Sequence, residues 1–120
     1  MKTKTIQMAI RILGLVQLIL GIVFWTGDIE FLVICHILLG SLLTIGLFAL
    51  VFRAHRSGVS KWAIIISAVW AIGLPLYGLI QEKILPGSYH WVAEVLHLLC
   101  GVGAVGVGEF LAAAINRKNK

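Results

Sequence analysis

Charged side chains are scarce in this sequence: Lys, Arg, Asp and Glu together make up 12% of its 120 residues, whereas hydrophobic residues make up 60%. A soluble domain of this size cannot bury so much apolar surface, because small domains leave a large share of their surface in contact with water. Cysteine is also rare, and both cysteines lie in apolar stretches, where this residue usually acts as a small buried hydrophobe. The composition therefore predicts a membrane protein.

Several signatures of other protein classes are missing as well. The sequence has no fixed-period repeat and no low-complexity segment, and its clustered glycines lie inside an apolar run rather than between a strand and a helix. Flavin or nucleotide binding is therefore not supported. The net charge of +5 does not by itself indicate nucleic acid, since basic residues in a membrane chain first report its orientation.

Four long apolar runs occupy most of the chain, over residues 5–25, 31–52, 62–80 and 91–115. Each is too long and too continuous for a strand, and about 20 apolar residues are enough for a helix to cross a bilayer. The prediction is one integral membrane domain over residues 1–120. Its fold class is all-α, as a four-helix transmembrane bundle with up-down-up-down topology.

The connecting segments alternate in charge, which predicts the orientation of the bundle. Nine of the ten Lys and Arg residues fall on one side of the membrane if both termini are cytoplasmic, and only Lys83 falls outside. Trp25, Trp62 and Trp91 lie at span ends, where an indole ring suits the headgroup level. We therefore expect both termini in the cytoplasm and a bacterial or archaeal cytoplasmic membrane as the location.

Four ionisable residues lie within the predicted spans: His36, Glu94, His97 and Glu109. Placing such a side chain in the bilayer costs free energy unless it is paired, hydrated or bound to a ligand. Glu109 is near the cytoplasmic end of the fourth span, and we expect an ion pair with Arg53, Arg56 or Arg117. Taken singly, each histidine is explained by a hydrogen bond to a neighbouring helix.

The two histidines share a depth in the predicted bundle. At 1.5 Å per residue, His36 lies roughly 8 Å and His97 roughly 9 Å below the outer boundary. The second and fourth spans run parallel and are diagonal neighbours, so inward-facing side chains at one level face each other across the core.

Two facing imidazoles predict a haem b site, because six-coordinate haem iron takes two such axial ligands and an apolar bundle supplies the surrounding slot. Gly40 and Gly101 each lie one helical turn deeper than a histidine on the same face, and we expect them to give the macrocycle backbone room. The predicted cofactor-binding residues are thus His36, His97, Gly40 and Gly101, with one haem per chain.

In its architecture and in His36 and His97, the chain resembles four-helix membrane b-type cytochromes, such as the cytochrome b561-like and quinol-linked cytochrome b families. The resemblance implies electron transfer, with the quinone pool as a partner, and a quinone-linked oxidoreductase or its cytochrome subunit as the setting. Many members carry a second haem about four turns along the same helices. The corresponding positions here are near Leu50 and Leu111, which cannot ligate iron, so one haem near the outer face is expected.

The start of the fourth span supports a second interpretation. His90, Glu94 and His97 share one helical face, and Glu94 to His97 forms a Glu-x-x-His unit of the kind that di-iron bundles use twice. An iron, copper or zinc site therefore stays open, with Cys35 and Cys100 as possible thiolates. Under the haem interpretation, Glu94 and His90 lie above the ring, where a proton path or a quinone contact is expected.

Two further classes of membrane protein remain as alternatives, a small exporter and a cofactor-free subunit. Small four-span exporters carry a glutamate in the first span, whereas here Gln17 is the only polar side chain deep in that span. A cofactor-free structural or assembly subunit is the other alternative. Ala104, Gly108 and Ala112 form a stripe of small residues that suits contact between helices or between copies in a homo-oligomer.

Overall fold

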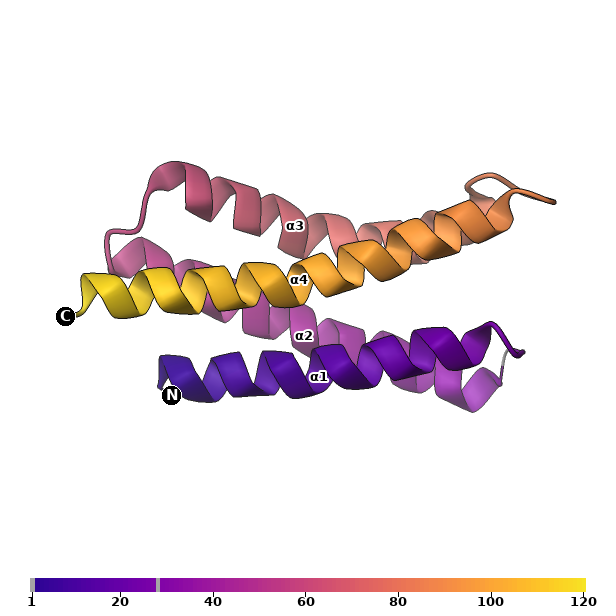
Figure 1. Cartoon of the computed structure of the whole chain (residues 1–120), viewed down its shortest axis with the longest axis horizontal. Coiled ribbons are helices and arrows are strands. Elements are labelled where there is room, and N and C mark those ends of the chain that lie inside the picture. Colours follow the sequence, from indigo (N-terminus) through magenta and orange to yellow (C-terminus); the bar gives the residue numbers. More distant parts are fainter. Residues whose placement is uncertain (1, 28) are drawn as a thin grey trace.

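The computed structural model describes residues 2–27 and 29–120, and over these residues the chain is all-helical (Figure 1). The helices are α1 (Thr3–Phe24), α2 (Glu30–Arg56), α3 (Lys61–Ile80) and α4 (His90–Lys118), with a short 3-10 turn η1 (Gln81–Lys83) after α3. Each of the four long helices is long and apolar enough to cross a membrane. The predicted all-α membrane class is confirmed at this level.

The helices match the four predicted spans, with differences of at most four residues at any end. The largest differences are at the C-termini of α2 and α4, which continue to Arg56 and Lys118. Basic residues stabilise the last turn of a helix, because the backbone carbonyls there carry partial negative charge. A helix can therefore extend beyond its apolar run, where a hydropathy boundary would end it.

Both termini lie at the same end of the structure, and the connections α1–α2 and α3–η1–α4 lie at the other end (Figure 1). We call these the terminal end and the loop end. Helices α2 and α4 contact each other, and each also packs against α1 and α3, whereas α1 and α3 do not touch within the described residues. The α2–α4 pair is therefore the centre of the fold.

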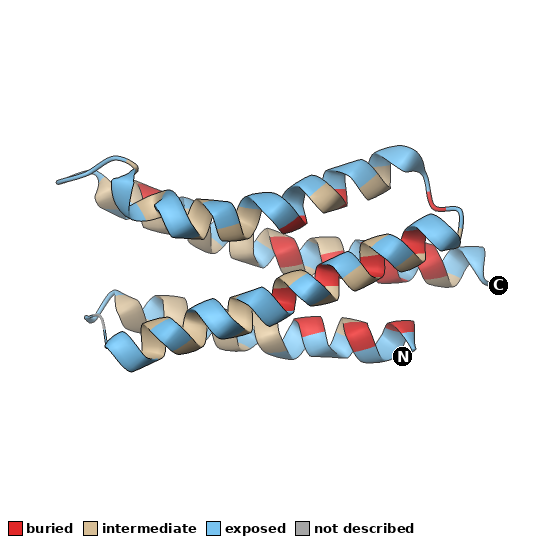
Figure 2. Ribbon diagram, turned by 180° about the vertical axis from the view of Figure 1, so that it is seen from behind, coloured by how far each residue is buried: buried red, intermediate tan, exposed pale blue. Residues whose placement is uncertain are grey.

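The tightly packed core lies in the terminal half, where most of the buried residues gather (Figure 2). Leu47 and Leu50 of α2 and Leu111 and Ile115 of α4 have no exposed surface, and Ile10 of α1 packs with them. Towards the loop end, most inward residues are only partly covered. The bundle thus has a dense half and a looser half.

The stripe of Ala104, Gly108 and Ala112 belongs to this core. All three are buried within the chain, and a Cβ added to Gly108 would lie 3.0 Å from Cγ2 of Ile10. Small residues here allow α4 to approach α1 and α2 closely. Of the two uses expected for the stripe, it serves helix contact within one chain, and a homo-oligomer would need another face.

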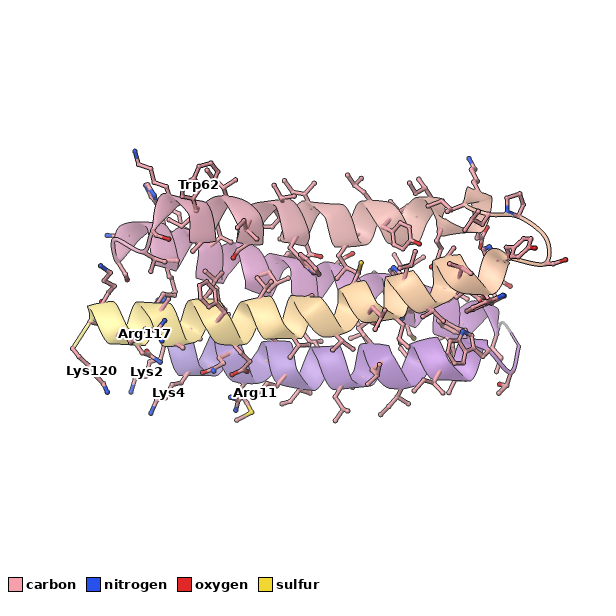
Figure 3. All side chains as sticks on the ribbon, turned by 45° about the horizontal axis from the view of Figure 1, so that its top comes forward. Lys2, Lys4, Arg11, Trp62, Arg117 and Lys120 are labelled. Carbon is pink, nitrogen blue, oxygen red and sulfur yellow. The ribbon has the colours of Figure 1, made fainter. Side chains whose placement is uncertain are left out.

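Glu109 forms an ion pair, but its partner differs from the predicted ones. Arg11 of α1 donates from Nη2 to Glu109 Oε2 at 2.8 Å and also bonds Oε1 through Nε, and Gln7 donates to Oε2 at 2.7 Å. The prediction of Arg53, Arg56 or Arg117 was wrong, because Arg11 of α1 lies beside Glu109, whereas the three predicted residues belong to the last turns of α2 and α4. In Figure 3, Lys2, Lys4, Arg117 and Lys120 gather at the terminal end.

Candidate metal centre

His36 of α2 and His97 of α4 meet in the looser half of the bundle. Their ring centroids are 6.2 Å apart, and the two ring planes are inclined by 61°. The contact between α2 and α4 makes this approach possible, since the two helices are direct neighbours. The structure therefore brings together the two residues that the sequence put at one depth.

An aromatic ring lies on each side of the pair. The Phe24 ring lies 5.4 Å from the His36 ring, edge to face, and the Tyr77 ring lies 5.7 Å from the His97 ring. The Tyr77 hydroxyl donates to the Ala93 carbonyl oxygen at 2.9 Å. Because that hydroxyl is already used, Tyr77 presents an apolar ring to the pair.

Both imidazoles have a nitrogen without a partner. Nδ1 of His36 and Nδ1 of His97 are buried and make no hydrogen bond within the described part of the chain. A buried polar atom is normally satisfied, and an exception points to a ligand, an ion or a water molecule. The pair therefore has unused hydrogen-bonding and ligating capacity.

The separation of the rings suits one metal ion between them. Two imidazoles that bind one metal ion through bonds of about 2 Å have ring centroids about 6 Å apart, close to the 6.2 Å between His36 and His97. Within the described residues no group of three or more His, Cys, Asp or Glu side chains could hold a metal. Two protein ligands suffice for haem, in which the porphyrin supplies the other four, but they are fewer than structural zinc or copper sites use.

The two glycines expected beside the haem have different surroundings. A Cβ on Gly40 would lie 2.6 Å from Nε2 of Gln17, and this amide donates to the His36 carbonyl oxygen at 2.9 Å. The Gly40 face is therefore filled by Gln17 and is not open. Nothing lies within 4 Å of a Cβ on Gly101, so that face is free.

Sequence reasoning missed a third glycine. A Cβ on Gly78 of α3 would lie 2.9 Å from Cε1 of His97, so the imidazole rests directly on the α3 backbone. The spacing of Tyr77 and Gly78 gave no signal for this contact, because it depends on how α3 is rotated about its axis. Gly78 and Gln17 are the residues to add to the predicted set.

Glu94 and His90 lie on α4 between His97 and the loop end. His90 Nε2 is 3.9 Å from Glu94 Oε1, and His90 Nδ1 is 3.3 Å from the Ile84 carbonyl oxygen. Glu94 also lines an open groove with Phe24, Trp25, Trp91 and Val95. Phe24 therefore borders both this groove and the His36 ring.

The remaining candidates do not join the pair in a cluster. Cys35 and Cys100 are free thiols, and Trp70 Nε1 donates to the Cys100 carbonyl oxygen at 3.0 Å. Leu50 and Leu111, at the second-haem positions, have no exposed surface and belong to the dense core. The imidazole pair is thus the chemically distinctive feature of the described spans.

No known protein family, curated protein or solved structure matches the chain. The function is therefore argued from the residues and their geometry.

Proposed function

We propose that this chain is an integral protein of a bacterial or archaeal cytoplasmic membrane that binds one haem b through His36 and His97 and exchanges electrons with the quinone pool. In this proposal the bundle is up-down-up-down with both termini cytoplasmic, so the imidazole pair lies towards the outer face. The chain then acts as a cytochrome, alone or as the subunit of a quinone-linked oxidoreductase.

The observation that carries the proposal is the meeting of two imidazoles from α2 and α4 at 6.2 Å, each with an unpartnered buried nitrogen. Two unrelated structural histidines would be expected to bond backbone or side-chain partners of their own. An inorganic metal site is less favoured, because the described residues offer no third ligand near the pair.

When bound, haem b supplies one-electron redox chemistry. The residues of the chain hold it and control its surroundings. His36 and His97 bind the iron, Phe24 and Tyr77 cover the pair with apolar rings, and His97 is supported by the α3 backbone at Gly78. A macrocycle extends well beyond the two imidazole rings, so haem binding requires the side chains around the pair in the looser half of the bundle to move apart.

Glu94 and His90 are the groups proposed to handle protons beside the quinone. They lie 3.9 Å apart on α4, nearer to the loop end than His97. A carboxylate and an imidazole at this level can accept protons released when a quinol is oxidised. The second-haem positions are occupied by Leu50 and Leu111, which belong to the dense core and cannot ligate iron.

The test is the visible spectrum of the protein purified from haem-replete membranes. We expect a Soret band and sharp α and β bands on reduction, because two imidazoles give low-spin haem iron. Replacing His36 or His97 by Ala should remove or greatly weaken the bound haem, whereas His55→Ala at the end of α2 should not. A colourless protein that also fails to take up added haem would refute the proposal and favour a cofactor-free assembly subunit.

A further inference from the structure

A second site lies at the loop end, in the groove between the end of α1 and the start of α4. Its lining residues are Phe24, Trp25, Trp91, Glu94 and Val95, and its volume is about 410 Å³. The ribbons of α1 and α4 diverge towards this end (Figure 1). Three of the five lining side chains are aromatic and one is a carboxylate.

The carboxylate in this groove has no strong partner among the described residues. Among the described residues, the ionisable group paired with Glu94 is His90, whose Nε2 lies 3.9 Å from Oε1 and thus beyond hydrogen-bonding distance. The side chain of Glu94 is 38% exposed. An external cation can therefore reach this carboxylate without displacing an internal one.

The charge of the neighbouring residues also favours a cationic ligand. Residues 25–30 and 81–94 contain four of the five acidic residues of the chain, Asp28, Glu30, Glu82 and Glu94, and only one basic residue other than histidine, Lys83. This excess of negative charge attracts cations to the loop end.

Aromatic rings select among cations. The face of an indole attracts a positive charge through its quadrupole, and Trp25 and Trp91 are 53% and 59% exposed. A small metal ion is not suited to this groove, because it needs several oxygen ligands and Glu94 is the only carboxylate in the lining. A cation that carries alkyl groups can use both the carboxylate and the rings.

We propose that this groove binds a substituted ammonium ion from the outer aqueous phase, with its charge beside Glu94 and its alkyl groups against Trp25, Trp91 and Phe24. The site uses neither His36 nor His97, but it shares Glu94 with the proposed quinone contact and Phe24 with the cover of the histidine pair. Its outer location rests on the orientation given in the proposed function. The groove volume is within the range of small-molecule pockets.

The experiment is a tryptophan-fluorescence titration of the full chain in nanodiscs of phosphatidylglycerol, which has no ammonium headgroup. Choline is the probe, and its uncharged isostere 3,3-dimethylbutan-1-ol is the control ligand. We expect a saturable response to choline alone. Glu94→Gln and Trp91→Leu should each weaken choline binding by about tenfold.

Matched variants separate the groove from general effects. Glu82→Gln removes a charge from η1, outside the lining, and Trp62→Phe removes an indole at the opposite end of the structure (Figure 3). Both should bind choline as the parent does. Val95→Phe fills the groove without changing a charge and should also weaken choline binding. It provides a second test of the groove that does not depend on the folding of Glu94→Gln.

Two results would overturn the proposal. The first is an equal response to the uncharged isostere, and the second is an equal loss of binding in Glu82→Gln and Glu94→Gln.

Nanodiscs of phosphatidylcholine identify the source of the ammonium group. Weaker choline binding in these nanodiscs would support the ligand chemistry of the groove and show that a lipid headgroup competes for it, whereas unchanged binding would support a free ligand.

Discussion

His97 lies against a position on α3 where only glycine leaves enough room. The Cβ of an alanine at Gly78 would approach Cε1 of the imidazole to 2.9 Å, closer than side-chain carbons normally approach other atoms. The same helix offers a position without this constraint, because nothing lies within 4 Å of a Cβ on Gly73. The two glycines form a matched pair for mutagenesis.

Gly78→Ala should displace the His97 ring and weaken haem binding by about tenfold, the size of effect typical for residues that orient a metal ligand. Gly73→Ala should leave haem affinity unchanged. Haem titration of the purified apoprotein, followed by the Soret absorbance, measures both. Equal affinities for the parent and Gly78→Ala would mean that His97 is not held by the α3 backbone.

The Arg11–Glu109 pair places two charges within a largely apolar surface. Arg11 lies about 12 Å along α1 from its first residue, and its guanidinium makes two bonds to Glu109, which also accepts from Gln7. A charge in an apolar environment is tolerated when it is paired and becomes costly when its partner is removed. Removing one charge of the pair should therefore destabilise the protein more than removing both.

Glu109→Gln should lower the thermal unfolding midpoint, because Arg11 loses its counter-charge. The double variant Arg11→Leu with Glu109→Leu should recover much of this loss, since no unpaired charge remains. Glu82→Gln, on η1, is the control and should have little effect. Thermal unfolding in detergent, followed by circular dichroism, provides the measurement. A double variant less stable than Glu109→Gln would contradict this interpretation.

Helix α2 presents different neighbours along its length, and this explains why its leucines are not equivalent. Leu50 has no exposed surface and belongs to the dense core, whereas Leu38 is 60% exposed on the outside of the bundle. In lipid the outward leucine is already in an apolar environment, so truncating it removes few protein contacts. The inward leucine leaves a cavity when it is truncated.

Leu50→Ala should destabilise the bundle by about 2 kcal/mol, near the lower end of the usual range because lipid is as apolar as a leucine side chain. Leu38→Ala should have an effect close to zero. Unfolding of both variants in mixed micelles gives the two values directly. Similar losses at the two positions would mean that the dense half does not pack as described.

The helices themselves were predictable from the sequence, but their rotation was not. The spans at 5–25 and 62–80 match α1 and α3 closely, because hydrophobic length alone determines them. The spans are apolar on all sides, so periodicity does not indicate which face points inwards. Small residues and polar pairs determine that face, and for this reason the Arg11 partner of Glu109, the Gln17 contact at Gly40 and the role of Gly78 emerged only from the structure.

The distribution of charge along the chain predicts its orientation. Lys2, Lys4, Arg117 and Lys120 lie at the terminal end (Figure 3), and the helix ends that flank the α2–α3 connection add Arg53, Arg56 and Lys61 there. Such a bias predicts cytoplasmic termini, since basic segments are retained in the cytoplasm.

A cysteine-accessibility experiment tests this orientation. With Cys35 and Cys100 replaced by Ala, a membrane-impermeant maleimide should label Ser88→Cys in intact cells. It should label Ser57→Cys only after the membrane is opened, because the α2–α3 connection is expected in the cytoplasm. The reverse pattern would show that the bundle is inserted the other way round.

The proposed haem should then react from one side of the membrane. His36 and His97 lie in the half of the bundle towards the loop end, and at the level of Leu50 and Leu111 the described core is apolar and has no exposed surface. A membrane-impermeant reductant should therefore reduce the haem much faster in right-side-out vesicles than in inverted ones. Stopped-flow absorbance on both vesicle types measures the rates, and haem content per chain is determined in parallel. Equal rates, faster reduction in inverted vesicles, or two haems per chain would show that either the orientation or the ligand assignment is wrong.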